Sequence, residues 1–115
     1  MPDLVPLYPR PPAQVAVYVE VLGYDLALDF LLAFGGAVIY LPKQPQGRSE
    51  IEALIGRENL LRLSAEDHRL PRRVPLAKKW VASMLAAKGQ SVSAIARRLH
   101  ASDVSVRKWI AGHAP

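Results

Sequence analysis

The apolar residues in the carboxy-terminal part of the chain recur at the spacing of an α-helix. Four of them lie at i, i+3, i+4 and i+7, which predicts a short helix after Ser91 with one buried stripe: Val92, Ile95, Ala96 and Leu99. A tight turn follows at His100, where glycine is usual because the turn residue takes positive φ; histidine tolerates that conformation. Ser102 comes next, and its hydroxyl can accept a hydrogen bond from the free amides of a second helix.

The second helix has an apolar face and a basic face. Its inward residues would be Val106, Trp109 and Ile110. Its outer ridge, again at i, i+3, i+4 and i+7, has two cations at its centre: Val104, Arg107, Lys108 and Ala111. Two short helices at a steep angle, the second with a basic outer face, describe a helix-turn-helix. The alternative is an ordinary helical hairpin whose basic face is only solvated.

A support helix is predicted just before this motif. Pro75 would open it and Gly89 would end it, over the segment from Leu76 to Lys88. Its apolar residues would face inward: Ala77, Trp80, Val81, Met84 and Leu85. The three helices together predict a helix-turn-helix domain over residues 74–112.

The amino-terminal half begins with an arm. Residues 1–13 contain five prolines, too many for a regular element. Residues 13–22 alternate as a strand would, yet Val15, Val19 and Leu22 also fit a helix, which we prefer for the reason given below. Residues 24–34 carry a helical stripe ended by Gly35 and Gly36. Residues 37–41 are β-branched and aromatic and predict a short strand ended by Pro42.

A weak internal repeat follows. A shift of 33 residues aligns 22–25, Leu-Gly-Tyr-Asp, with 55–58, Ile-Gly-Arg-Glu, and a four-residue deletion aligns 41–43 with 70–72. Residues 50–54, which align near 13–22, are plainly helix-compatible, and this favours a helix at 13–22. We therefore expect a helical region over 14–73, made of two copies, 14–43 and 47–73, with their short strands paired. The expected fold class is mainly α with one or two short β-strands, then the three-helix domain.

Charge is distributed unevenly along the chain. The 115 residues carry a net charge of +5 and no cysteine, which excludes disulfides and thiolate metal sites. Residues 1–68 hold five cations and nine acids, whereas residues 69–115 hold ten cations and one acid. A block this basic attracts a polyanion, and we rank duplex DNA well above an anionic membrane. Neither a signal peptide nor a membrane span fits the apolar pattern.

Individual residues of the motif have distinct expected roles. Arg107 is the best candidate for a base contact, since its guanidinium can read guanine through two hydrogen bonds; an ion pair with Asp103 is the alternative. Val104 either touches a thymine methyl or belongs to the helix–helix contact. The carboxylate of Asp103 interacts favourably with the helix dipole at the start of the helix but would repel phosphate. Phosphate contacts are expected from Lys108, Arg97 and Arg98, and hydroxyl contacts or capping from Ser102 and Ser105.

A second basic group precedes the motif, and catalytic residues are not apparent. The group could grip the flanking DNA backbone or only aid solubility: Arg72, Arg73, Lys78 and Lys79. The three histidines are scattered and form no metal-ligand pair at i, i+4. The sequence also contains no glycine-rich phosphate-binding loop. We therefore expect no enzyme, no metal and no cofactor.

The run from Ala33 to Lys43, Ala-Phe-Gly-Gly-Ala-Val-Ile-Tyr-Leu-Pro-Lys, followed downstream by a helix-turn-helix, resembles the Mor/C family of phage Mu-like transcription activators. The resemblance covers residues 22–110. It implies a helical dimerisation region, a strand led by two glycines, promoter binding as a dimer and recruitment of RNA polymerase. For Gly35, Gly36, Tyr40 and Lys43 it implies a strand near DNA or a pairing strand, and for Tyr40 we prefer packing or pairing.

The expected function is sequence-specific regulation of transcription, by an activator of the phage or prophage type acting in the bacterial cytoplasm at the nucleoid. The chain would be a homodimer or a monomer with internally paired copies. The alternative is a small helical adaptor whose basic half binds an acidic partner, or DNA without sequence choice.

Overall fold

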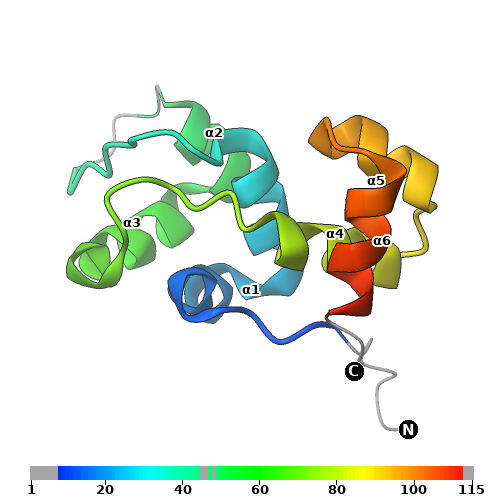
Figure 1. The fold of residues 1–115 in the computed structure, drawn as a ribbon. Coiled ribbons are helices and arrows are strands. Elements are labelled where there is room, and N and C mark those ends of the chain that lie inside the picture. The colour runs from blue at the N-terminus through cyan, green and yellow to red at the C-terminus, as the bar shows by residue number, and fades with distance from the viewer. Residues whose placement is uncertain (1–7, 45–46, 48, 113–115) are drawn as a thin grey trace, which may run out of the picture. The chain divides into compact units, whose positions relative to one another are not determined.

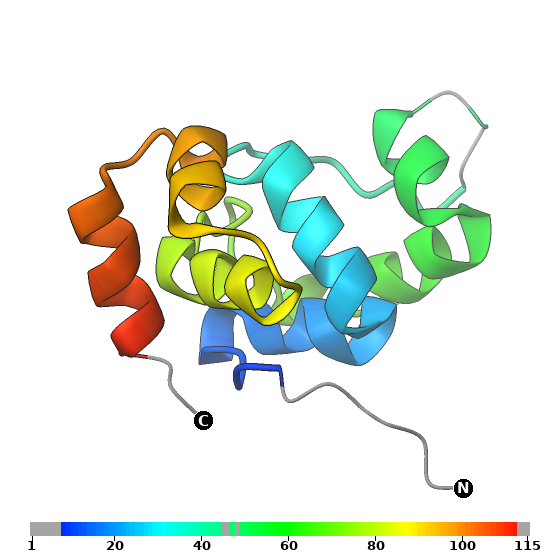
Figure 2. The ribbon, with the colours of Figure 1, turned by 90° about the vertical axis from the view of Figure 1, so that its right-hand side faces the viewer.

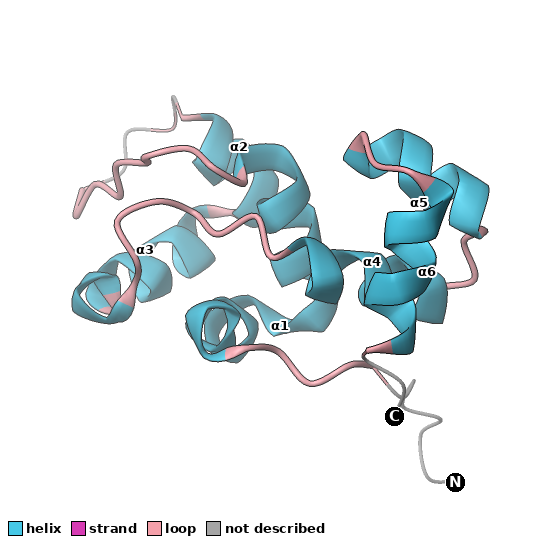
Figure 3. Ribbon diagram, in the orientation of Figure 1, coloured by secondary structure: helices cyan, strands magenta, loops and turns pink. Residues whose placement is uncertain are grey.

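The computed structural model describes residues 8–44, 47 and 49–112. The chain divides into two compact units, residues 11–76 and residues 77–112 together with 8–10 (Figure 1). Helices dominate both, so the mainly α prediction is confirmed (Figure 3). No helix in the described part of the chain is long and apolar enough to cross a bilayer.

The unit of residues 11–76 contains two helix–glycine–helix segments. The first is α1, Ala13–Phe34, which is broken at Gly23 (φ 82°, ψ 169°). The second comprises α2, Glu50–Ile55, and α3, Arg57–Ala65, which meet at Gly56 (φ 84°, ψ 162°). The helix preferred for residues 13–22 is confirmed, because α1 begins at Ala13 and continues through this segment. Its buried residues here are Val15, Val17 and Tyr18. Gly23 and Gly56, which the internal repeat aligns, have nearly the same φ and ψ and so the same backbone conformation.

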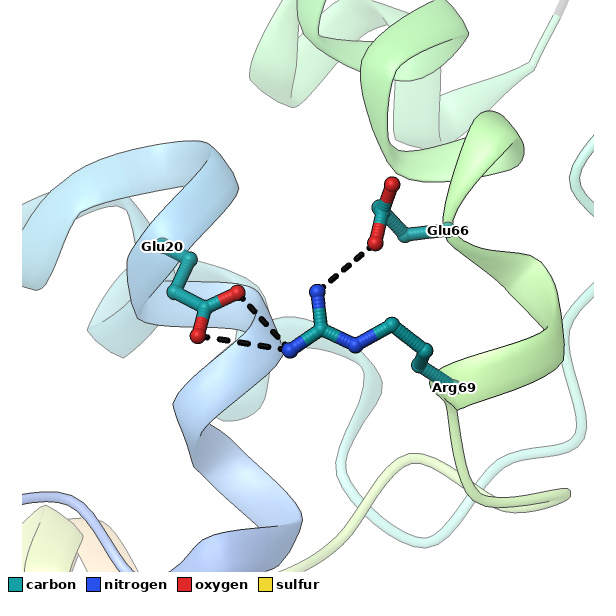
Figure 4. Close-up of polar contacts among 3 residues, drawn as sticks. All are labelled: Glu20, Glu66 and Arg69. Carbon is teal, nitrogen blue, oxygen red and sulfur yellow. Dashed lines mark hydrogen bonds and ion pairs between the residues drawn. The ribbon is translucent and has the colours of Figure 1, made fainter.

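Packing joins the two segments. Helix α1 contacts both α2 and α3, and a short 3₁₀ helix, η1, Asp67–Arg69, follows α3. The buried side chains come from both segments: Ala27, Leu28, Phe30, Leu31, Ile51, Ile55, Leu60 and Leu63. Figure 4 shows an exposed brace in which Arg69 reaches Glu20 of α1 (Nη2 to Oε2, 3.0 Å) and Glu66 (Nη1 to Oε1, 2.7 Å). The hydrogen bond from Arg69 lowers the pKa of the Glu66 carboxyl.

The expected strands are not formed in the described residues. Only an isolated antiparallel bridge joins Val38 to Arg73, with the amide of Gly36 donating to Val74 O (2.7 Å) and the amide of Val74 donating to Ala37 O (2.8 Å). The pairing thus uses residues 73–74, whereas the internal repeat aligned 41–43 with 70–72. Prolines at 42, 71 and 75 lie on both sides of the bridge and lack the N–H groups that a ladder needs, so it ends after one pair.

The unit of residues 77–112 is a three-helix group: α4, Lys78–Ala87, α5, Val92–Leu99, and α6, Asp103–Ala111. Helix α4 contacts both of the others. It begins at Lys78, so the predicted start at Leu76 after Pro75 is wrong. Val74 is held by hydrogen bonds to Gly36 and Ala37, and Ala77 adopts a left-handed conformation (φ 46°, ψ 48°) directly before the helix.

The core of this unit is centred on Trp80. Its indole N–H donates to the carbonyl of Pro9 (3.0 Å), and both residues are buried. The other buried apolar side chains come from all three helices: Val81, Ala82, Met84, Leu85, Ile95, Ala96 and Val106. Residues 8–10 of the predicted arm therefore pack on this unit, while residues 1–7 lie outside the described residues. Trp109 and Ile110, predicted to face inward, are half-buried.

Candidate nucleic-acid interface

Helix α5 is fixed at both ends by local hydrogen bonds. At its start the amide of Ala94 donates to Ser91 Oγ (3.1 Å), which caps the helix. At its end His100 lies in the left-handed region (φ 54°, ψ 48°), as the sequence predicts for the turn. The amide of Ala101 then donates to Ala96 O (2.9 Å), which closes the carboxy-terminal turn as a Schellman motif. Histidine thus fills a position where glycine is usual.

Helix α6 starts directly after this turn (Figure 2). The amide of Ser105 donates to Ser102 Oγ (3.1 Å), and the two serine hydroxyls lie 3.1 Å apart. Ser102 therefore acts as the N-cap. Val106 is fully buried and sets the inward face of the helix. The two helices and their turn have the connection expected of a helix-turn-helix.

The outward face of α6 is the predicted ridge. Val104 is 73% exposed, and the other three members of the ridge are exposed as well: Arg107, Lys108 and Ala111. Although the structure describes both residues, no ion pair joins Asp103 to Arg107. The Arg107 guanidinium is therefore not held by the carboxylate that was its alternative partner. Val104, at 73% exposed, is not buried between the helices, which was its alternative role.

The other helices of the unit carry further exposed cations. Residues 77–112 contain seven lysines and arginines, all exposed, and one acid, Asp103: Lys78, Lys79, Lys88, Arg97, Arg98, Arg107 and Lys108. On α5, Arg97 Nη1 donates to Ser93 Oγ (3.3 Å). The ammonium of Lys88 lies 5.8 Å from the centre of the Tyr8 ring, a cation–π contact. A net charge of this sign and density attracts a polyanion.

The second predicted basic group is divided between the two units. Lys78 and Lys79 are exposed in the first turn of α4, whereas Arg72 and Arg73 belong to the unit of residues 11–76. Arg73 Nη1 donates to the carbonyl of Gly36 (3.3 Å), so its side chain braces the isolated bridge.

The residues that match the family strand lie after α1. Gly35 ends the helix and Gly36 has φ +87°, as the predicted helix stop requires. A Cβ atom at position 35 would lie 2.6 Å from Leu31 O, so only glycine fits there. Tyr40 is 80% exposed and neither packs in the core nor pairs in a strand, contrary to the preferred role. Lys43 is exposed.

One contact near the interface was missed by sequence reasoning. The carbonyl of Pro9 and the indole of Trp80 are 71 residues apart in the chain, and no local pattern links them. The available signal is general: a buried tryptophan requires an acceptor for its N–H. Within the described residues, no group of three histidine, aspartate or glutamate side chains is placed to hold a metal ion.

Comparison with protein-family profiles, curated proteins and solved structures found no match for this chain. Its function is therefore inferred from the residues of α4, α5 and α6 themselves.

Proposed function

We propose that this protein is a transcription regulator that binds duplex DNA with sequence preference by inserting α6 into the major groove. The observation that carries the proposal is the ridge of α6, which is exposed, centred on two cations and set behind a serine-capped turn. Recognition helices of this motif contact base edges through residues near their amino terminus. The net positive charge of residues 77–112 supplies attraction to phosphates.

The roles of the side chains follow from their position. Arg107 is the base-reading residue, because its guanidinium matches the O6 and N7 acceptors of guanine. Phosphate contacts fall to cations on all three helices: Lys108, Arg97, Arg98, Lys78 and Lys79. Ser102 is already used as a cap, so its contribution is to hold the start of α6 in place.

The resemblance to the Mor/C family extends this proposal to an activator of the phage type that helps to recruit RNA polymerase. The chain acts either as a homodimer or as a monomer whose two helix–glycine–helix segments pair with each other. The contacts of α1 with α2 and α3, and the bridge between residues 38 and 73, favour the second arrangement.

The test is a selection of binding sites from random duplex DNA at about 0.15 M salt, where nonspecific binding is already weakened. Wild type, Arg107→Ala and a matched control, Arg57→Ala, are compared; Arg57 is an exposed arginine of α3 in the other unit. We expect wild type and the control to enrich the same motif. Arg107→Ala should lose a guanine preference and bind that motif about 5- to 150-fold more weakly, as for one bidentate base contact.

A phosphate contact should behave differently. Lys108→Ala should weaken binding to all sequences alike and reduce the slope of log K against log salt by about 1. If wild type enriches no motif, the proposal fails and the adaptor alternative is favoured. If Arg107→Ala enriches an unchanged motif, the assignment of Arg107 is wrong.

A further inference from the structure

Val104 is an apolar side chain that the fold does not use. It is the second residue of α6 and is 73% exposed, whereas Val106, two residues later, is fully buried. Valine is a poorer helix former than alanine, and an exposed apolar side chain contributes no free energy of burial to folding. The stability of the helix therefore gives no reason for valine at this position.

The neighbours of Val104 place it beside the base-reading residue. Arg107 and Lys108 follow at i+3 and i+4, so the three side chains lie on one face of α6. Side chains at i and i+3 are about 5–6 Å apart, and successive base pairs are about 3.4 Å apart. A residue at position 104 would thus reach a base pair one or two steps from the one read by Arg107.

Asp103 indicates which part of DNA the start of α6 approaches. Its carboxylate is exposed, is joined to no cation in the described structure and would be repelled by phosphates. Base edges in the major groove include the amino groups of cytosine and adenine, which can donate to a carboxylate. The start of the helix, Val104 included, is therefore suited to base edges and unsuited to the phosphate backbone.

The chemistry of those edges selects one contact for an exposed valine. In the major groove the four base pairs present hydrogen-bond donors and acceptors, and the one apolar group among them is the C5-methyl of thymine. On the basis of the proposed function, we infer that Val104 reads this methyl group, on a thymine one or two base pairs from the guanine that Arg107 contacts. Val104 is thus a specificity residue for a site containing both bases.

The experiment removes the methyl group and leaves every hydrogen-bonding group of the base unchanged. Each thymine of the selected site is replaced singly by deoxyuridine, and Kd is measured by fluorescence anisotropy for wild type, Val104→Ala and Val38→Ala. Val38 is a second exposed valine (54% exposed), in the other unit, and serves as the matched control. Because position 104 is exposed and alanine favours helices, Val104→Ala should fold as wild type does.

We expect one thymine at which deoxyuridine weakens binding of wild type and of Val38→Ala about fourfold, as for one buried methyl-sized group. Val104→Ala should bind both duplexes equally, with the affinity of wild type for the deoxyuridine duplex. A motif with no deoxyuridine effect, or an effect that persists in Val104→Ala, would overturn the inference while leaving the proposed function intact. Failure of wild type to enrich any motif would overturn both.

Discussion

Replacing Gly23 with alanine should destabilise the unit of residues 11–76 although the added methyl group would touch nothing. Gly23 has φ 82° and ψ 169°, and a Cβ atom built there meets no heavy atom within 4 Å. The cost is therefore conformational. This region of the backbone map is open essentially to glycine alone, and another residue held there costs about 1–3 kcal/mol.

The expected magnitude is the difference between two effects. Alanine also restricts the unfolded chain, which stabilises the folded state by about 0.4–1 kcal/mol. Taking the middle of each range, the net loss should be about 1.3 kcal/mol. Gly56 has φ 84° and ψ 162° and the same empty surroundings, so Gly56→Ala should lose a similar amount.

The assay is urea unfolding followed by far-UV circular dichroism, in which the midpoint should fall by roughly 1 M. Both tryptophans, Trp80 and Trp109, lie in the unit of residues 77–112, so their fluorescence follows that unit separately. Gly112→Ala is the neutral control: Gly112 has φ −71° and ψ −12°, and its nearest neighbour to a Cβ is 3.6 Å away. Amide hydrogen exchange in α1 should locate the loss of stability at Gly23.

Two further variants separate backbone strain from steric conflict. Gly35→Ala has an ordinary φ of −52° but would place its Cβ 2.6 Å from Leu31 O, so it should destabilise through a clash. D-alanine at position 23, introduced by chemical synthesis, should restore stability, because the mirror image of the Gly23 conformation lies in the ordinary extended region. If L-alanine at position 23 leaves the urea midpoint unchanged, the reasoning is refuted.

Two other predictions concern His100 and Tyr18. Because His100 is left-handed, His100→Gly should raise the stability of the unit of residues 77–112 by about 0.5–1 kcal/mol, measured by tryptophan fluorescence in urea, and an unchanged midpoint would contradict this. Burial, with a contribution from Asp67, raises the pKa of Tyr18 from 10.0 to about 12. The resulting stability is complete below pH 10 and is lost as pH rises toward 12, so Tyr18→Phe should reduce the alkaline loss seen in wild type, and the exposed control Tyr40→Phe should not.

The parts of the fold that are encoded locally could be predicted from the sequence. The cap at Ser102, the turn at His100 and the outward ridge of α6 depend on residues at most a few positions apart, and each is found where the pattern indicates. The stop of α1 at Gly35 is of the same kind. For this reason the positions of the candidate base-reading residues could be deduced before the structure was known, although their contact with DNA stays a prediction.

The parts that depend on distant residues could not be predicted. The bridge depends on the hydrogen bonds of Val74 with Gly36 and Ala37, some 37 residues earlier in the chain, and the left-handed Ala77 just before α4 has no local sequence signal. The bridge is one pair long because prolines flank it, whereas β-propensity at 37–41 predicted a strand. Tyr40 is exposed for the same reason, because no strand forms around it in the described residues.

The conformation shared by Gly23 and Gly56 bears on the kind of DNA site that this protein selects. If the segments around these glycines are two copies of one dimerisation unit that pack against each other, a single chain has no free copy left to pair with a second chain. Such a chain carries one α6 and should select one short, asymmetric site. A homodimer would instead present two copies of α6 and select a two-fold symmetric site with half-sites about one helical turn apart. The symmetry of the selected motif therefore distinguishes the two arrangements. The mass of the DNA-free protein in solution provides a second test: a monomer that selects an asymmetric site would support internal packing of the two segments.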